Sequence, residues 1–371
     1  MTRKNLEGNF RYIKLKKTSL YNSHLNQGAK MIDFAGWIMP LQYKNGIISE
    51  VKSVRNSVGM FDVSHMGRIK FTKAKSLNIL EKLISINIHK LKNGRAKYNL
   101  ICNEAGKIID DAIISNVNDE NFYLVVNAIN TQKIIDWFNK FGAKSNMSDI
   151  TYDTSMIALQ GPNSLKIINQ FSKNSLILKK FGIIETDLFN IKCILSRTGY
   201  TGEDGVEIIC KSNSATDLWN NLIDNNVTPC GLASRDVLRI EAGLPLYGNE
   251  LTEQISPNES GLEKFVNTDS KIYLVKKRIR ELKPKKRLLG IKLIEKGIPR
   301  KGQKILNPVN NKIIGEISSG TFSPTINSGI ALGYLNSGYL INYKNIIVDI
   351  RGKNTKGKII DIPFIKSKPL K

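Results

Sequence analysis

The pattern of apolar and turn residues changes near residue 285, and this change limits the folds that the chain can adopt. Upstream, apolar runs such as "NFYLVVNAI" and "GVEIIC" alternate with helical stretches such as "AKSLNILEKLISIN". Downstream, short apolar segments are separated by Gly, Pro and Asn turns, as in "NNKIIGEISSGTFSP" and "NIIVDIRGK". The pattern predicts an α+β part followed by a small all-β barrel or sandwich, with a boundary in the basic stretch around residues 270–286.

Length and composition narrow the class further. The chain has 371 residues and is 41% hydrophobic, which is too long for one compact domain. Its N-terminal stretch has no apolar secretory core, and no run approaches the roughly 20 apolar residues of a membrane-spanning helix. The four cysteines show no C-x-x-C spacing, and three histidines offer little for a metal site. We therefore expect free thiols, no metal and a cytoplasmic location.

The chain is strongly basic, with 56 Lys and Arg against 32 Asp and Glu and a net charge of +24. Such a balance can mark a protein that meets nucleic acid, a membrane or acidic partners. The cations are scattered from end to end, which favours a general compositional tendency over a dedicated patch. One concentration, "VKKRIRELKPKKR" at residues 275–287, has eight cations and one Glu, a pattern more often found in a solvated helix or linker. We expect neither nucleic-acid binding nor membrane association.

The stretch "KIIDDAIISN" (residues 107–116) places two acids inside an apolar run that is typical of a buried or half-buried strand. Neighbouring side chains on a strand point to opposite faces, so Asp110 and Asp111 are not expected to share one environment. A buried carboxylate is costly unless it is paired or used. One of the two acids is therefore a candidate for function.

Four further segments have residue patterns that are not typical of either a hydrophobic core or an exposed surface. Each can also be explained by a structural role without any function. Asp62 and His65 could pair and cap a turn, the glycines of residues 199–205 could form a hairpin bend, and Arg235 could pair with its neighbour in sequence. No Ser/His/Asp order, P-loop or dinucleotide fingerprint is present. Taken singly, these residues predict only an enzyme-like protein with acids and aromatics in loops. The segments are "DFAGWIMPLQY" (33–43), "GMFDVSHMGRI" (59–69), "SRTGYTGEDGVEI" (196–208) and "GLASRDVLRIEAGLPLYGNEL" (231–251).

In order and spacing, these segments together with "NEAGKIIDDAII", "IALQGP" and "SSGTFSPT" resemble the aminomethyltransferase family of the glycine cleavage system, the T proteins. The resemblance runs from about residue 16 to about residue 364. It implies an enzyme that transfers the methylene carbon of aminomethyl-dihydrolipoyl H protein to tetrahydrofolate, with release of ammonia and formation of 5,10-methylenetetrahydrofolate. Tetrahydrofolate would be the acceptor, and the partner H protein would supply the lipoyl group. We expect a monomer that docks the H protein transiently through its positive surface.

The fold that the resemblance implies is an α+β, three-domain cloverleaf around a central folate channel. A discontinuous folate-binding domain would comprise residues 1–55 and 150–270, and an inserted α+β domain carrying the two acids would comprise residues 56–149. A linker at residues 271–285 would lead to a C-terminal β-barrel at residues 286–371.

The resemblance also implies roles for single residues. The family's essential aspartate falls on Asp111, with Asp110 as an outward, structural member of the pair, and whether Asp111 moves a proton or only orients the pterin is left open. Glu207, rather than Glu203, would accept hydrogen bonds from the pterin ring. Phe265 stands where many members carry Trp, and the C-terminal "IPFIKSKPLK" lacks a tyrosine that some members place near the ligand. The other pocket candidates are Met66, Tyr98, Tyr123, Asn127, Tyr200 and Arg235.

Two alternatives stay open on the same scaffold. One is a folate-dependent demethylase that acts on a small methylated donor, although such relatives lose parts of "DVSHM" and of the "GYTGEDGVE" loop, which this chain retains. The other is a non-catalytic folate-binding accessory protein, whose "KGCYxGQE"-like stretch is absent here.

Overall fold

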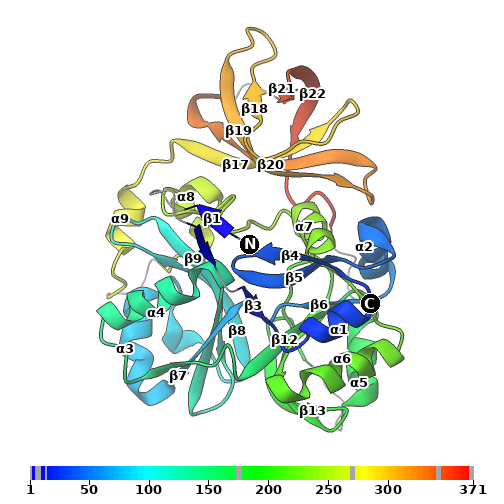
Figure 1. Cartoon of the computed structure of the whole chain (residues 1–371). Coiled ribbons are helices and arrows are strands. Elements are labelled where there is room, and N and C mark those ends of the chain that lie inside the picture. Colours follow the sequence, from blue (N-terminus) through cyan, green and yellow to red (C-terminus); the bar gives the residue numbers. More distant parts are fainter. Residues whose placement is uncertain are drawn as a thin grey trace.

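The computed structural model describes residues 15–172, 178–267, 272–339 and 344–366, and the backbone of strands β1 (Thr2–Lys4) and β2 (Phe10–Tyr12). Residue 271, where the expected linker begins, and residues 367–371, the end of the expected barrel domain, lie outside the described residues. Three lobes are visible, two of which are mixed helix and sheet and one of which is a barrel (Figure 1). The expected α+β class, three-lobed architecture and C-terminal barrel are confirmed.

The first lobe is an antiparallel five-stranded sheet with strand order β11-β7-β10-β9-β8. Its helices α3 and α4 pack on the sheet through a core rich in Ile, Leu and Phe. In this core the ring centroids of Phe71 and Phe138 lie 5.2 Å apart. The elements are β7 (Gly67–Thr72), α3 (Lys73–Leu83), η1 (Ile88–Lys90), β8 (Arg95–Cys102), β9 (Ile108–Asn116), β10 (Asn121–Val126), η2 (Ala128–Asn130), α4 (Thr131–Lys140) and β11 (Met147–Asp149).

The second lobe is a six-stranded sheet with strand order β13-β14-β15-β12-β6-β16. Its first strand, β6, pairs with β12, so the chain passes from this sheet to the other one between Asp62 and Gly67. The elements are α1 (Tyr21–Asn26), β6 (Gly59–Asp62), β12 (Thr154–Gln160), α5 (Ser164–Phe171), β13 (Ile183–Leu188), β14 (Ile191–Ser196), β15 (Gly205–Lys211), η3 (Ser212–Ser214), α6 (Ala215–Asp224) and β16 (Thr228–Pro229).

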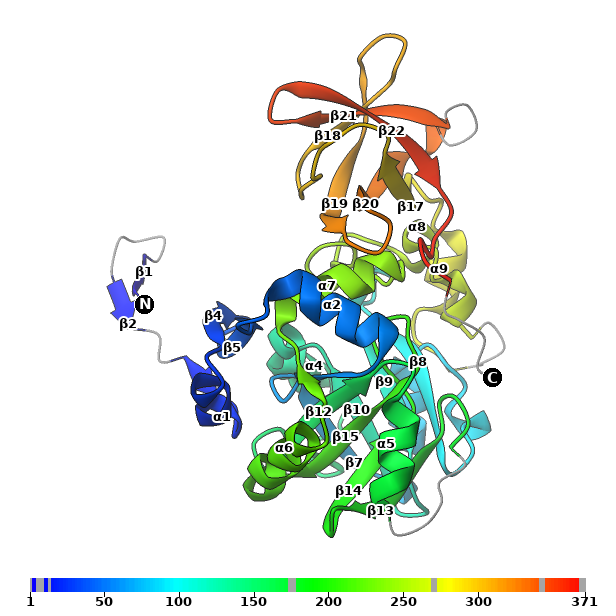
Figure 2. The same cartoon turned by 90° about the vertical axis from the view of Figure 1, so that its right-hand side faces the viewer.

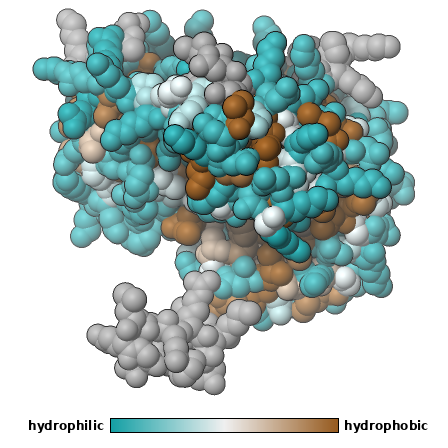
Figure 3. All heavy atoms as spheres, turned by 90° about the horizontal axis from the view of Figure 1, so that it is seen from above, coloured by the Kyte–Doolittle hydropathy of each residue, from teal (hydrophilic) through white to brown (hydrophobic). Residues whose placement is uncertain are grey.

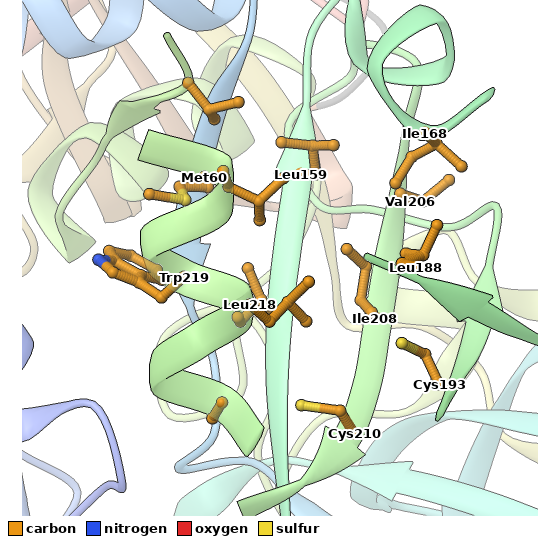
Figure 4. Packing of buried hydrophobic residues seen from close by; sticks show 14 of the residues in the cluster. Met60, Leu159, Ile168, Leu188, Cys193, Val206, Ile208, Cys210, Leu218 and Trp219 are labelled. Carbon is orange, nitrogen blue, oxygen red and sulfur yellow. The ribbon is translucent and has the colours of Figure 1, made fainter. Parts of the chain in front are cut away.

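Helix α6 packs on the sheet of this lobe and buries the side chains of Trp219 and Leu218 against it (Figure 4). Cys193 of β14 and Cys210 of β15 are register partners on neighbouring strands of the same core. Both thiols are free, and burial raises the pKa of each. They behave as small apolar side chains rather than as reactive groups.

Between the lobes lie a small sheet and two helices. The sheet is made of β3 (Lys16–Lys17), β4 (Lys30–Phe34) and β5 (Trp37–Gln42). Helix α7 (Leu232–Glu241) packs against α2 (Gly46–Asn56) and β5. Figure 2 shows α2 and α7 between the barrel and the rest of the chain.

The third lobe is a closed barrel with strand order β17-β20-β19-β18-β21-β22. Its interior is filled by Ile, Leu and Val side chains, as expected for a small barrel. The basic stretch before it contains a short helix rather than only a linker. The elements are α8 (Pro257–Ser260), η4 (Glu263–Phe265), α9 (Lys276–Glu281), β17 (Lys286–Leu293), β18 (Lys304–Leu306), β19 (Ile313–Ser323), β20 (Ser328–Asn336), η5 (Ser337–Tyr339), β21 (Asn345–Ile350) and β22 (Lys353–Ile360).

Buried ion pairs join α7 to the barrel. Arg239 of α7 pairs with Glu250 at 2.7 Å and donates to the hydroxyl of Ser319 on β19 at 2.6 Å. Glu250 in turn accepts from Ser318 at 2.6 Å. Arg239 and Glu250 are almost fully buried, so each depends on the other for compensation of its charge. The network therefore fixes the orientation of the barrel relative to α7.

A second network joins α7 to α2 and to the loop before β15. Glu241 pairs with Arg55 of α2 at 2.6 Å and also accepts from Ser323 of the barrel. Arg55 additionally pairs with Glu203 at 2.8 Å and donates to the carbonyl of Thr201. The end of α7 is thus held to three different parts of the chain at once.

The face seen from above is mostly hydrophilic, with apolar residues gathered towards its middle (Figure 3). Within the described ranges, no helix is long and apolar enough to cross a membrane.

Candidate functional site

The side chain of Asp110 is fully buried, so the expectation that it points outward is wrong. Its carboxylate accepts from the backbone N–H of Asn127 at 3.0 Å, from Asn127 Nδ2 at 2.7 Å and from Asn130 Nδ2 at 2.8 Å. The register with β8 is unbroken from Asp110 to Asn116, and Asp110 lies on the face of β9 that also carries the buried Ala112 and Ile114. The alternation of faces therefore holds here, and it is the face assigned to Asp110 that was wrong.

The side chain of Asp111 is half-buried. Tyr98 donates its hydroxyl to Oδ2 at 3.0 Å, and Asn127 Nδ2 donates to Oδ1 at 2.8 Å. The side-chain amide of Asn127 therefore contacts both carboxylates. The expectation that the two acids cannot share one environment is also wrong.

Burial raises the pKa of both acids above the usual range of a carboxyl group. For Asp110, the negative charge of Asp111 raises the pKa further, and the donors from Asn127 and Asn130 offset part of the rise. For Asp111, the hydrogen bonds from Tyr98 and Asn127 favour the anion and moderate the effect of burial. The pair can therefore exchange a proton with its surroundings much closer to neutral pH than an exposed carboxylate can.

Tyr98 and Phe265 form an aromatic contact beside Asp111. Their ring centroids are 4.8 Å apart at an interplanar angle of 69°, an edge-to-face arrangement. Tyr98 comes from β8 and Phe265 from the 3₁₀ turn η4, so the contact joins segments that are far apart in the sequence. The two rings also line a cavity of about 430 Å³.

Arg235 is a buried cation on α7 with one end left without a hydrogen-bond partner. Its guanidinium lies 5.1 Å from the ring of Tyr200 and 5.8 Å from the ring of Phe61. Within the part of the chain that the structure describes, Nη1 of Arg235 has no hydrogen-bond acceptor. Burial lowers the pKa of Arg235, and the opposite charge of Glu207 raises it. A buried donor of this kind is suited to a polar group of a ligand.

Glu207 is buried on β15, where Thr198 donates to its Oε2 at 2.5 Å. Tyr123 of β10 lies with Glu207 on the wall of a small cavity of about 20 Å³, which has room for no more than a single water. Met66 packs in the apolar cluster that also contains Phe61. The alternative acid, Glu203, is occupied by its ion pair with Arg55.

These contacts form one site rather than two. The negative charge of Asp111 raises the pKa of both Tyr98 and Tyr200, in addition to the larger effect of burial. Tyr200 also contributes to the rise in the pKa of Tyr98. Tyr200 is held in place by a hydrogen bond from its hydroxyl to the carbonyl of Pro245 at 2.5 Å. Asp111 and Tyr98, which share a hydrogen bond, therefore lie near Tyr200 and Arg235, which contact each other.

The "DVSHM" segment is organised differently from the expected Asp62–His65 pair. Asp62 accepts from Thr18 at 2.7 Å and lies 3.0 Å from Nε2 of His24, whose Nδ1 lies 2.8 Å from the hydroxyl of Tyr43. Burial acts to raise the pKa of Asp62, but the hydrogen bonds from His24, Ser64 and Thr18 outweigh it and lower the pKa to about 2. This acid is committed to structure.

His65 is left free of that network. Its ring is buried and lies 5.4 Å from the ring of Phe34, and its Nδ1 has no hydrogen-bond partner among the described residues. Burial lowers the pKa of His65 to about 4, and the charges of Arg235 and Arg68 add to that effect while Asp62 opposes it. The imidazole is therefore neutral at physiological pH.

Sequence reasoning missed three contributors to this site. Asn130 binds Asp110, Thr198 binds Glu207, and Phe61 lies against Arg235. The spacing of Asn127 and Asn130 in "NAIN" was an available signal, because residues three apart in a helical turn lie on one side. Phe61 and Thr198 have no local signal, because only the pairing of distant strands brings them in. Within the described ranges, no group of three or more His, Cys, Asp or Glu side chains could hold a metal ion.

Comparison with known proteins gives consistent matches along most of the chain. Residues 20–270 match the family model described as the GCVT N-terminal domain, and residues 286–366 match the glycine cleavage T-protein C-terminal barrel domain. An aminomethyltransferase of Aquifex aeolicus is 43% identical over 352 residues, covering 95% of this chain and 96% of the relative. One from Thermoanaerobacter is 39% identical over 363 residues, covering 95% and 98%. The crystal structure of the glycine cleavage system aminomethyltransferase T from Bartonella henselae has a TM-score of 0.88 and 30% identity, covering 95% of this chain and 99% of that one.

Proposed function

This chain belongs to the glycine cleavage T protein family, and from that premise we propose how its residues perform the family's reaction. The protein is an aminomethyltransferase of the glycine cleavage system and depends on tetrahydrofolate. The residues named below as binding or acting on the substrates are our assignment.

The reaction joins two substrates and needs no external oxidant. The donor is an aminomethyl group held as a thioether-like S–CH₂–NH₂ on the dihydrolipoyl arm of an H protein. The C–S and C–N bonds of this group break, and new bonds form from carbon to N5 and N10 of tetrahydrofolate. The two N–H protons that the folate loses appear in the products, one on the lipoyl thiol and one in ammonia.

Arg235 and Glu207 are suited to the pterin end of the folate. Nη1 of Arg235 is a buried donor without an acceptor among the described residues, which is an energetically costly state that a ligand would relieve. Glu207 uses Oε2 for Thr198, so Oε1 can accept from the amino-pyrimidine edge. The ring of Tyr200 lies against Arg235 and keeps its guanidinium plane in place.

Asp111 is suited to the reacting centre. Its carboxylate is fixed on both oxygens, by Tyr98 and by Asn127, so no reorganisation is needed when positive charge develops nearby. The raised pKa of the acid pair also allows Asp111 to accept a proton from a folate nitrogen and pass it on to the departing amine. Asp110 holds Asn127 and thereby positions the amide that fixes Asp111.

The single observation that carries this proposal is the fixed carboxylate of Asp111 in the same site as the unpartnered Arg235. The test is a fluorescence titration of tetrahydrofolate into wild type, Glu207→Gln and, as a matched control, Glu104→Gln at an exposed surface position. We expect wild type and the control to bind equally and Glu207→Gln to bind about tenfold or more weakly, because a buried ligand hydrogen bond to a charged group is lost. Equal binding by all three proteins would remove Glu207 from the site.

A further inference from the structure

His65 is a buried imidazole to which the proposed mechanism gives no role. Its side chain is 6% exposed, and Nδ1 makes no hydrogen bond within the part of the chain that the structure describes. The ring of Phe34 lies edge-on to it, with centroids 5.4 Å apart. A buried polar atom without a partner is costly, so its presence in a native fold calls for an explanation. A polar group of a substrate would supply the missing partner.

The turn that carries His65 is rigid. It connects β6 of one sheet to β7 of the other, and the buried Arg68 donates to the carbonyls of Ser64 at 3.1 Å and Met66 at 2.6 Å, on either side of the histidine. The hydroxyl of Ser64 also accepts from the backbone N–H of Met156 at 3.0 Å. The backbone that holds the imidazole is therefore fixed before any substrate binds, as a preorganised binding group requires.

The two ends of this turn lie against the two halves of the proposed site. At its start, the ring of Phe61 lies 5.8 Å from the guanidinium of Arg235. At its other end, Gly67 pairs with the residue of β10 that precedes Asn127. The side chain of Asn127 donates to Asp111 at 2.8 Å. The turn therefore runs from the proposed pterin end of the site to the acid centre, and it carries the histidine along this path.

The surroundings of His65 keep its imidazole neutral. Burial lowers the pKa to about 4, the positive charges of Arg235 and Arg68 lower it as well, and the charge of Asp62 opposes them. A neutral imidazole has one nitrogen with a hydrogen and one with a lone pair. With the hydrogen on Nε2, Nδ1 is an acceptor, and it stays an acceptor at neutral pH because its own protonation requires a much lower pH.

The amine of the donor is the substrate group for which this site has the fewest assigned partners. Arg235 and Glu207 are assigned to the pterin edge, and Asp111 is assigned to the reacting centre. The amine of S–CH₂–NH₂ has two N–H groups and one lone pair, and the proposed mechanism uses only the lone pair, which takes a proton from Asp111. An acceptor for one N–H would orient this lone pair.

We propose that His65 binds the amine of the aminomethyl donor, which donates an N–H to Nδ1. The hydrogen bond turns the lone pair of the amine towards Asp111, which delivers the proton with which ammonia leaves. His65 does not change its own protonation state, so the bonds and protons balance as given above. The proposal rests on the proposed function and adds the residue that recognises the primary amine.

The reverse reaction isolates this contact, because it takes up ammonia as a free substrate. Wild type and the variants His65→Leu, His65→Asn and His65→Gln are supplied with 5,10-methylenetetrahydrofolate, dihydrolipoyl H protein and ammonia at one fixed pH. Initial rates of formation of aminomethyl H protein give separate KM values for ammonia and for the folate. Leucine removes the acceptor, asparagine places an amide oxygen close to the position of Nδ1, and glutamine places its amide closer to that of Nε2.

We expect the KM for ammonia to rise about tenfold in His65→Leu and His65→Gln, from the loss of one buried hydrogen bond, and at most about threefold in His65→Asn. The KM for the folate is expected to match that of wild type in all three variants. His89→Leu is the matched control, because the side chain of His89 is 49% exposed and pairs with Glu81 outside the site. If His65→Leu does not fold, the comparison of His65→Asn with His65→Gln carries the test.

Three results would overturn the proposal. An unchanged KM for ammonia in His65→Leu and His65→Gln would mean that the imidazole does not bind the amine. An equal loss in His65→Asn and His65→Leu would mean that the ring is needed for packing rather than as an acceptor. A higher KM for the folate alone would place His65 at the pterin end. If wild type itself forms no aminomethyl H protein, the proposed function fails.

Discussion

The hydroxyl of Tyr98 donates to Oδ2 of Asp111 at 3.0 Å. A residue of β8 therefore helps to set the position and the pKa of the carboxylate on which the proposed chemistry depends. The bond favours the anionic form of Asp111 and opposes the rise in pKa that burial causes. The same tyrosine packs on Phe265 with its ring. Tyr98 thus couples the protonation of Asp111 to the wall against which the folate is proposed to lie.

Replacing Tyr98 by Phe tests this coupling. The variant keeps the ring and loses the hydrogen bond, so the pKa of Asp111 rises further. Because the proposed mechanism needs the anion, activity is lost as pH falls through that pKa, and the acid limb moves to higher pH. We expect the pH of half-maximal kcat/KM to increase by about 1, the change that corresponds to a hydrogen bond of about 1.5 kcal/mol. The pH profile of kcat/KM measures it.

If the acid limb of the pH profile of kcat/KM were the same in Tyr98→Phe and wild type, the ionisation of Asp111 would not be what determines that limb. Tyr152→Phe is the control, because Tyr152 is an exposed tyrosine outside the proposed site. Its profile is expected to match that of wild type.

Replacing Asp110 by Asn tests the role of the buried acid. Three N–H donors converge on its carboxylate, and an amide NH₂ placed there would face donors instead of accepting from them. We expect a loss of about 1–3 kcal/mol in the free energy of unfolding and a reduced kcat, because Asn127 would no longer be held against Asp111. Urea unfolding measures the first effect. A variant as stable as wild type would mean that Asp110 carries a proton in the native state and resembles an amide already.

Phe265 provides a test of the aromatic wall. Phe265→Ala removes the partner of Tyr98 and part of the lining of the cavity beside the two rings. We expect the KM for tetrahydrofolate to rise about tenfold, from lost aromatic contact and lost apolar burial, with a smaller change in kcat. Phe265→Trp retains an aromatic face and should bind folate at least as well as wild type. Equal KM values for Phe265→Ala and wild type would remove the residue from the site.

The buried interactions of Arg239, which connect α7 to the barrel, give a prediction about the free energy of unfolding. Arg239→Met leaves Glu250 buried without its cation, which we expect to cost about 3–5 kcal/mol. Ser319→Ala removes only one hydrogen bond from Arg239 and should cost about 0.5–1.5 kcal/mol. Chemical unfolding of both variants gives the comparison, and similar small losses in the two would show that the ion pair contributes no more than a single hydrogen bond.

Local sequence patterns were enough to predict the barrel and the α+β part, because the period of apolar residues and the turn residues are local signals. They could not predict that Asp110 is the buried member of the pair, because its compensating donors, Asn127 and Asn130, come from a different segment. Nor could they pair Asp62 with His24 rather than with His65, since that choice depends on how α1 packs on β6. The site residues were proposed from the resemblance of the long motifs to a family, whereas the contact between Tyr98 and Phe265 joins two distant segments that no single motif spans.

The most direct test of the account is single-turnover release of ammonia from aminomethyl-loaded H protein, with and without tetrahydrofolate, for wild type and Asp111→Asn. The account predicts release from wild type that depends on tetrahydrofolate and falls by at least about 100-fold in the variant, while the variant still binds folate. Full activity in Asp111→Asn would contradict the role of Asp111. Folate binding by wild type without release of ammonia would mean that the donor is different, and small methylated amines would be tried in its place.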